Sequence, residues 1–163
     1  TFPVNGKFSK EQREIYEIVL EASKKSIETV ISGSNPLKAH ETSVEIISQG
    51  LLDLGLLDGD LNEMIESNRY FDFYMHRVGH YMGLDVHDVG GKDMNGEWLN
   101  YAPGMITTIE PGIYINENLD VPEKYKNIGI RIEDNVVVTE TGFKVLTDLV
   151  PKEVNDIESL MNS

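Results

Sequence analysis

Residues 105–115 read Met105-Ile-Thr-Thr-Ile-Glu-Pro-Gly-Ile-Tyr-Ile115. This pattern predicts two short strands with a carboxylate between them, and these strands determine the fold class. Apart from Glu110 and the turn pair Pro111-Gly112, its residues are mainly β-branched, aromatic or otherwise apolar, which is typical of strands. A carboxylate at the end of a buried strand is costly unless it is paired or bound to a metal. Glu110 is therefore either a residue that caps the turn or a functional residue.

The same arrangement recurs at Glu133, which stands between Ile132 and the apolar run Val136-Val137-Val138. This repetition favours the functional interpretation of both glutamates. Arg131 lies two residues before Glu133 and so shares its strand face, where a guanidinium could orient a carboxylate. The other acidic residues nearby are expected to support ligands or turns rather than to bind a metal themselves; they are Asp85, Asp88 and Asp134.

Further strands are predicted after this stretch, and the first half of the chain has helical patterns instead. Thr139-Glu140-Thr141-Gly142 is typical of a hairpin turn. The predicted strands cover residues 105–109, 112–115, 128–132, 135–139 and 143–146. Ser9 and Gln12 form a capping-box pattern at the start of a helix. The predicted helices run from there to about residue 30, over 37–57, for one turn over 61–65, and from about residue 154. Two N-terminal helices followed by antiparallel strands and a short C-terminal helix make an α+β domain.

Composition narrows the possible functions of the chain. Its 163 residues suffice for one hydrophobic core and do not require two domains. Its 28 acidic against 14 basic residues give a formal charge of -14, which works against binding to nucleic acid or to anionic membranes. The absence of Cys excludes disulfides, thiol nucleophiles and zinc–thiolate sites, and it is compatible with a reducing cytoplasm.

Three of the four histidines, His76, His80 and His87, fall within 12 residues and are interleaved with Gly79 and Gly83. Such a cluster favours a functional site, and glycines would let the backbone pass close to a ligand or a metal shell. One imidazole and two carboxylates from separate segments suit a single divalent cation, or half of a two-ion site. The fourth histidine, His40, stands alone in a polar helical stretch and is expected to be structural or exposed.

Four stretches together resemble the aminopeptidase P and prolidase branch of the pita-bread metallopeptidases. The stretch from Tyr74 to Gly90 looks like the histidine motif of that family. Its two glutamate motifs are matched by Glu110-Pro111-Gly112-Ile113-Tyr114 and by Gly129-Ile130-Arg131-Ile132-Glu133-Asp134-Asn135. The opening Thr1-Phe2-Pro3-Val4-Asn5-Gly6-Lys7-Phe8 is similar to the segment that follows the aspartate motif in aminopeptidase P.

The resemblance implies a role for each matching residue. The implied metal ligands are His80, Glu110 and Glu133, with Glu133 bridging two ions, for which Mn²⁺ is expected. The residues implied to contact the substrate and stabilise the tetrahedral intermediate are His76 and His87. The residues implied to form a hydrogen-bonding support around the metals are Arg131 and Tyr114. Glu110 would also shuttle a proton. One small departure is Arg77, where many relatives have Gly.

The resemblance also implies that residues 1–163 are the C-terminal part of a longer catalytic domain with a partial pita-bread fold. Two Asp ligands and a cap domain would precede Thr1, so the chain alone is expected to be inactive. The whole enzyme would be a cytoplasmic, homo-oligomeric, proline-specific metalloaminopeptidase that hydrolyses the N-terminal Xaa-Pro bond of peptides. Two alternatives stay open at this point. One is a prolidase, which is limited to dipeptides, and the other is a pita-bread protein that has become a binding module.

Overall fold

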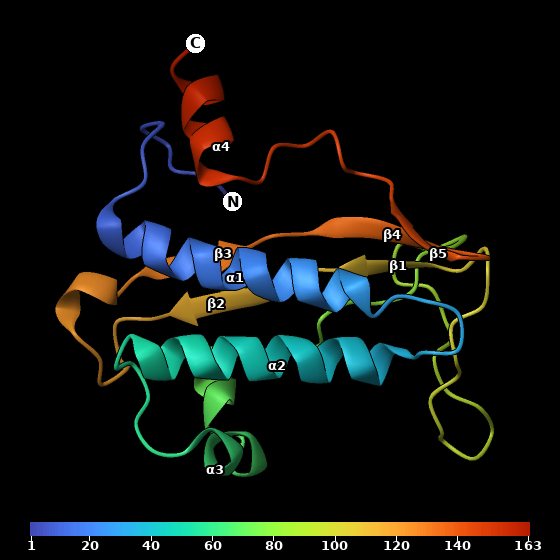
Figure 1. Ribbon diagram of the computed structural model, residues 1–163. Coiled ribbons are helices and arrows are strands. Elements are labelled where there is room, and N and C mark those ends of the chain that lie inside the picture. Colours follow the sequence, from blue (N-terminus) through green and yellow to red (C-terminus); the bar gives the residue numbers. More distant parts are fainter.

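A computed structural model describes all residues from Thr1 to Ser163. Two long helices lie side by side over one face of a set of short antiparallel strands (Figure 1). The first helix, α1 (Lys10–Glu28), begins with the predicted capping box. The Ser9 hydroxyl accepts from the Gln12 N–H, and the Gln12 side chain accepts from the Ser9 N–H. The α+β fold class is confirmed.

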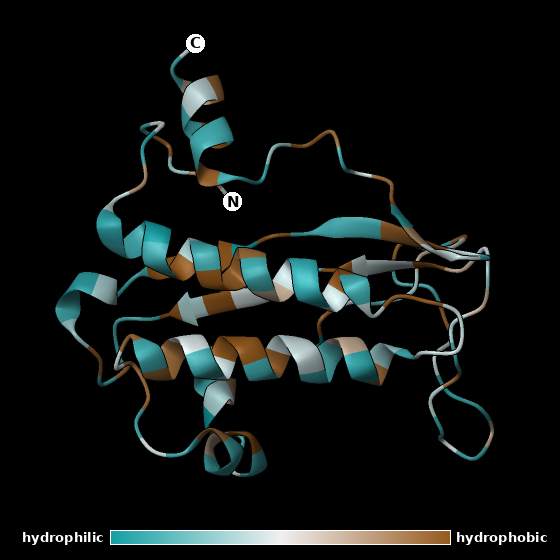
Figure 2. Ribbon diagram, viewed as in Figure 1, coloured by the Kyte–Doolittle hydropathy of each residue, from teal (hydrophilic) through white to brown (hydrophobic).

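The second helix, α2 (Pro36–Asp53), ends four residues earlier than predicted. Leu54 caps it, and Gly55 follows with φ +68°, a left-handed conformation that glycine adopts without the steric cost of a side chain. The apolar residues 54–57 therefore pack after the helix rather than within it. Figure 2 shows that both long helices carry apolar stripes beside hydrophilic ones. None of the helices combines the length and the apolar character needed to cross a membrane.

Four shorter helical segments complete the helical part of the chain. They are α3 (Leu61–Glu66), which confirms the predicted extra turn, the 3₁₀ turns η1 (Arg69–Asp72) and η2 (Glu123–Tyr125), and the C-terminal α4 (Val154–Met161).

The five predicted strands are present with shifts of one residue at some ends. They are β1 (Ile106–Ile109), β2 (Gly112–Ile115), β3 (Ile128–Arg131), β4 (Asp134–Thr139) and β5 (Gly142–Val145). One sheet has the order β1-β4-β5, and β2 pairs with β3 in a second ladder. All pairs are antiparallel. The final two strands form the predicted hairpin.

The two ladders share one register, and this fixes the relation between the candidate ligands. Ile109 pairs with Asp134 in one ladder and Gly112 pairs with Arg131 in the other. If the pairing is continued inward from Ile109–Asp134 and from Gly112–Arg131, Glu110 lies opposite Glu133. Regular pairing is interrupted at this point. The two glutamates therefore occupy facing backbone positions, as expected of residues on adjacent strands.

A third segment, residues 78–82, runs along the free edge of β1. The Thr108 N–H donates to the His80 carbonyl at 2.9 Å, and the Glu110 N–H donates to the Val78 carbonyl at 2.6 Å. A Cβ at Gly79 would lie 1.9 Å from the carbonyl oxygen of Thr108. Gly79 is thus required by the close approach of the β1 backbone, whereas the sequence suggested a ligand or metal shell.

The larger hydrophobic core lies between the two long helices and the β2–β3 ladder. Ile113 on β2 and Ile130 on β3 are buried in it together with Ile15 and Val19 of α1. Because side chains alternate along a strand, Tyr114 and the residues next to Ile130 face away from the helices. The face of the strands opposite the helices is thus left for polar residues.

Candidate functional site

Glu110 stands at the centre of a polar cluster on the face of the strands that points away from the helices. Its side chain is 13% exposed. One carboxylate oxygen accepts from Arg131 Nη1 at 3.2 Å, and the other accepts from the Thr108 hydroxyl at 3.2 Å. Nε2 of His80 lies 3.5 Å from that second oxygen. The carboxylate at this strand end is therefore paired, as burial requires.

Arg131 connects Glu110 to two further predicted residues. Its Nε donates to the Tyr114 hydroxyl at 2.7 Å, and its Nη2 lies 3.1 Å from His76 Nε2. The Tyr114 hydroxyl is 2.9 Å from the same nitrogen of His76. Four residues predicted to belong to one site, Glu110, Arg131, Tyr114 and His76, thus form one hydrogen-bonded network.

The backbone sets the tautomers of two histidines. Nδ1 of His76 lies 2.8 Å from the Arg77 carbonyl, and Nδ1 of His80 lies 2.9 Å from the Tyr81 carbonyl. A carbonyl oxygen can only accept, so each Nδ1 carries the proton that is donated. In the neutral rings Nε2 is then an acceptor. In a neutral His80 this directs the Nε2 lone pair at the Glu110 carboxylate, an arrangement that a bound cation would satisfy.

The donor set and its spacing fit a divalent cation on this side of the site. Metal bonds of about 2.0–2.2 Å to nitrogen and oxygen put neighbouring ligand atoms about 3–3.5 Å apart. The 3.5 Å between His80 Nε2 and Glu110 Oε1 falls in that range. An imidazole held by a carbonyl through its other nitrogen is also the usual arrangement of a metal-binding histidine.

Glu133 does not join this cluster through its side chain. It is exposed and forms no hydrogen bond or ion pair with His80 or Glu110, although its backbone lies opposite Glu110. No group of three or more His, Cys, Asp or Glu side chains has a metal-binding arrangement. The expected meeting of His80, Glu110 and Glu133 at one point is therefore not present, and only the first two approach each other.

His87 lies apart from the network of His76. Its ring is 4.4 Å from that of His80, centroid to centroid, and nearly perpendicular to it. The ring nitrogens of His87 form no hydrogen bond within the chain, and the residue is exposed. The histidine cluster is thus divided between His76 on one side and His80 with His87 on the other.

Thr108 is a member of the site that was not predicted from the sequence. Its hydroxyl accepts from the His80 N–H at 3.0 Å and donates to Glu110. The signal was present, because Thr108 and Glu110 are two residues apart on one strand and so share a face. Of the acidic neighbours, Asp88 accepts from the next N–H at 2.9 Å, which fits the predicted turn role.

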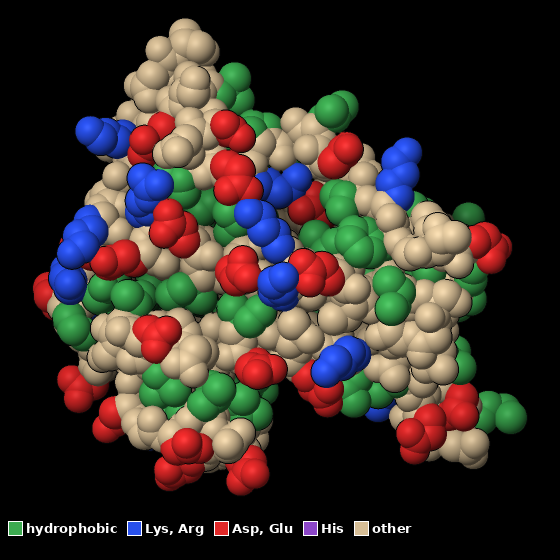
Figure 3. Space-filling model, in the orientation of Figure 1, with side chains coloured by type: hydrophobic (Ala, Val, Ile, Leu, Met, Phe, Trp, Pro, Cys, Tyr) green, Lys and Arg blue, Asp and Glu red, His purple; other side chains and the backbone are tan.

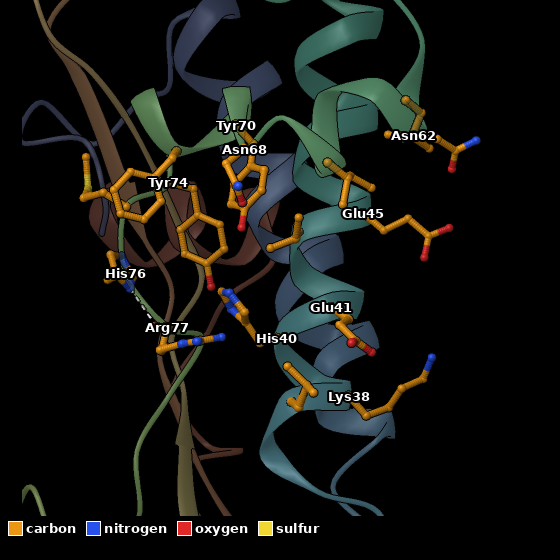
Figure 4. A pocket seen from close by; sticks show the side chains of 16 residues that line it. Lys38, His40, Glu41, Glu45, Asn62, Asn68, Tyr70, Tyr74, His76 and Arg77 are labelled. Atoms are coloured by element: carbon orange, nitrogen blue, oxygen red, sulfur yellow. Dashed lines mark hydrogen bonds between the residues drawn. The ribbon is translucent and has the colours of Figure 1, made fainter. Parts of the chain in front are cut away.

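His40 is neither fully exposed nor part of the polar network. It borders a cavity of about 920 Å³ between α2 and residues 70–77, where its ring faces Tyr74 at 5.8 Å (Figure 4). Nδ1 of His40 is buried without a hydrogen-bond partner. Burial, followed by the charges of Arg77 and His76, lowers the pKa of His40 to about 4. The ring of Tyr74 in turn lies 5.0 Å from His76, edge-on, so the cavity adjoins the back of the site.

Comparison with known proteins identifies the relatives of this chain. The family model described as metallopeptidase family M24 matches residues 1–140. The chain is 55% identical to an Xaa-Pro aminopeptidase of Haemophilus influenzae and 48% identical to one of Escherichia coli, with 99% of the chain aligned in each case. It spans only 37% and 36% of their lengths.

Solved structures give the same picture. The aminopeptidase PepP of Pseudomonas aeruginosa matches with a TM-score of 0.96 and 52% identity over 99% of this chain and 37% of the other. A zinc-substituted aminopeptidase P of Escherichia coli in complex with product matches with a TM-score of 0.94 and 47% identity, over 99% of this chain and 36% of that one. The fold of this chain is therefore the corresponding part of the pita-bread fold. With a family model covering most of its residues, the chain belongs to metallopeptidase family M24.

Proposed function

We propose that this chain is the C-terminal part of the catalytic domain of a metalloaminopeptidase that releases the N-terminal residue from peptides with proline second. Two findings support the proposal. The relatives described above are Xaa-Pro aminopeptidases, and the chain covers little more than a third of each. The Thr1 hydroxyl also contacts the backbone of Arg131, at 2.8 Å from its carbonyl oxygen. Residues joined to Thr1 would emerge beside the site, where two further Asp ligands are expected.

One observation carries the metal-dependent chemistry. His80 and Glu110 direct acceptor atoms at each other over 3.5 Å, with the histidine tautomer fixed by a carbonyl. We propose His80, Glu110 and Glu133 as the ligands that this chain contributes to two divalent cations, with Glu133 shared between the ions and Mn²⁺ as the native metal. Such a pair of ions supplies an activated water and polarises the scissile carbonyl.

The residues of this chain have separate tasks in that reaction. Glu110 takes up a proton and delivers it to the proline nitrogen that leaves. Arg131 and Tyr114 hold Glu110 and His76 in place through the bonds described above. His87 is the better candidate for donating a hydrogen bond to the developing oxyanion, because its ring nitrogens have no partner within the chain. His76 uses its Nδ1 proton on a backbone carbonyl and its Nε2 on Arg131 and Tyr114, so both of its ring nitrogens are already used within the chain.

The alternatives have less support. The relatives compared are Xaa-Pro aminopeptidases, which favours the aminopeptidase over the prolidase. A binding module would not need the acceptor pair of His80 and Glu110. The resemblance supports a cytoplasmic enzyme and a homo-oligomer, and the lack of Cys is compatible with a reducing cytoplasm.

The test is hydrolysis by the full-length protein after metal removal and readdition. With Mn²⁺ restored, it should cleave an Xaa-Pro tripeptide and leave the same peptide with alanine second nearly untouched. Cleavage of Xaa-Pro dipeptides alone would favour the prolidase. Cleavage that survives chelation would contradict a metal-dependent mechanism. Metal binding without any hydrolysis would favour the binding module.

A further inference from the structure

A buried ion pair lies directly behind Glu133. The carboxylate of Asp134 is 4% exposed and lies 3.0 Å from the ammonium of Lys152, which is 17% exposed. Asp134 follows Glu133 in an extended segment, so the two side chains point to opposite faces. Lys152 therefore approaches the candidate ligand from the side of the core. From the sequence, Asp134 was expected to have only a supporting or turn role, and Lys152 was not identified.

The ion pair is embedded in further hydrogen bonds. The Lys152 ammonium donates to the carbonyls of Thr147 and Val150, both at 2.9 Å, and lies 3.0 Å from one carboxylate oxygen of Asp134. The Thr147 hydroxyl donates to Asp134 and accepts from the Asn135 N–H at 3.1 Å. The pair thus has one defined geometry, which ties the segment after β5 to the first residues of β4.

The same group is anchored to the helical layer. The Tyr16 hydroxyl of α1 donates to the Lys152 carbonyl at 2.8 Å, and Tyr16 is almost fully buried. The cluster of Tyr16, Lys152, Thr147 and Asp134 therefore connects α1 to the point where β4 begins.

At this point the regular strand pairing is interrupted. Between the paired residues Arg131 and Asp134 the backbone has one hydrogen bond across the strands, from the Ile132 N–H to the Pro111 carbonyl at 3.3 Å. The direction of Glu133 must then be set by its neighbours. Replacing a buried ion pair by apolar residues is often neutral or favourable for stability, so stability alone gives no reason for a charged pair here.

We propose that Lys152, through Asp134, is a positioning residue for the metal site: the buried pair holds the start of β4 so that the backbone of Glu133 lies opposite Glu110. The inference rests on the proposed function, since it assumes that Glu133 binds the metal. It adds a residue outside the three family motifs, 19 positions after Glu133 in the sequence.

The experiment measures Mn²⁺ binding to the metal-stripped full-length protein by calorimetry, with the thermal unfolding midpoint of the metal-free protein measured in parallel. Lys152→Met should weaken Mn²⁺ binding about 10- to 100-fold, as is usual when support behind a ligand is lost. The double variant Asp134→Leu/Lys152→Met removes the unpaired carboxylate and should regain the unfolding midpoint while its Mn²⁺ binding stays weak. Lys24→Met is the matched control, because Lys24 makes only an exposed ion pair with Glu153 at 2.6 Å.

The outcomes separate the two proposals. If the double variant binds Mn²⁺ as tightly as the wild type, the buried pair is only structural and the inference is overturned. If Lys152→Met fails to fold, the double variant alone still tests the inference. Glu133→Gln tests the underlying function: it should weaken binding whatever Lys152 does. Unchanged binding in Glu133→Gln would overturn both proposals.

Discussion

The two sides of the candidate site differ in whether hydrogen bonds within the chain hold their side chains in place. On the supported side, His76, Tyr114, Arg131 and Glu110 are linked by hydrogen bonds of 2.7–3.2 Å. On the open side, Glu133 and His87 are exposed and form no such bonds with the network. The supported residues satisfy one another, whereas the open ones have donor or acceptor capacity left for a metal or a substrate. Hydrogen bonds within the chain thus hold Glu110 and the residues that support it, whereas Glu133 and His87 are left free.

The largest expected effect comes from the chain by itself. Without the two Asp ligands proposed to precede it, a two-ion site loses both charge compensation and ligands. The isolated chain with added Mn²⁺ should therefore give only background hydrolysis of an Xaa-Pro peptide, next to full turnover by the full-length protein. Comparable turnover of the two would show that the open side needs nothing from outside this chain.

Within the full-length protein, Glu110→Gln should be the most damaging single substitution. It removes a proposed ligand and proton shuttle and leaves Arg131 without its carboxylate. The expected loss in kcat is about 10²- to 10⁴-fold, the usual range for general acid–base groups. Glu14→Gln, on α1, is the control, because Glu14 accepts a hydrogen bond from Tyr125 far from the site. A Glu110→Gln enzyme with near-normal kcat would remove Glu110 from the chemistry.

His87→Ala tests the open side directly. Because His87 has no hydrogen-bond partner within the chain, its loss should leave the unfolding midpoint nearly unchanged while lowering kcat by about 10²-fold, as for a lost oxyanion donor. Activity and thermal unfolding measured on the same preparation check both halves of this expectation. A fall in stability with intact activity would mean that the assignment to the open side is wrong.

Tyr114→Phe tests the supported side, where the effect should be smaller and mixed. The hydroxyl joins His76 to Arg131, so its removal should lower kcat about tenfold and lower stability by about 1 kcal/mol. Tyr125→Phe loses a comparable hydrogen bond, to Glu14 at 2.6 Å, and should affect stability only. Equal kinetics in the two variants would separate the Tyr114 network from catalysis.

The smallest effect is expected at His40, which borders the cavity behind the supported side. Its folded-state pKa of about 4 lies below the ordinary value of 6.5, so the unfolded chain binds the proton more readily. Stability should therefore fall as the pH drops from about 6.5 toward 4. His40→Gln, which has no such titration, should make the fall in unfolding midpoint over this window shallower. Parallel curves for wild type and variant would contradict the cause assigned to this pKa.

Local patterns were sufficient to predict most of the fold. The capping box at Ser9 and the run of β-branched and apolar residues around Glu110 depend on residues a few positions apart, and both elements were predicted. The end of α2 was missed because apolar residues continue past Asp53, while Gly55 already turns the chain. Boundaries of this kind depend on where the apolar side chains pack rather than on their sequence.

The arrangement of the site was predictable only in part. The motifs identified which residues belong together, yet the register that sets Glu110 against Glu133 depends on pairing between distant strands. The tautomers of His76 and His80 are set by backbone carbonyls, which no side-chain pattern reveals. Lys152 was missed because its partner Asp134 is brought near only by the path of the chain after β5. Acidic and basic side chains are spread over the surface shown in Figure 3, so surface charge did not indicate which of these residues belong to the site.

The central claim is that His80, Glu110 and Glu133 bind a divalent cation. The most direct measurement is a crystal structure of the full-length protein with Mn²⁺, recorded so that the anomalous signal locates the metal. We predict a peak about 2.0–2.4 Å from His80 Nε2 and from the carboxylate oxygens of Glu110 and Glu133, with the Glu133 side chain turned toward Glu110. An active, Mn²⁺-loaded crystal whose metal lies elsewhere, with no ion between His80 and Glu110, would contradict it.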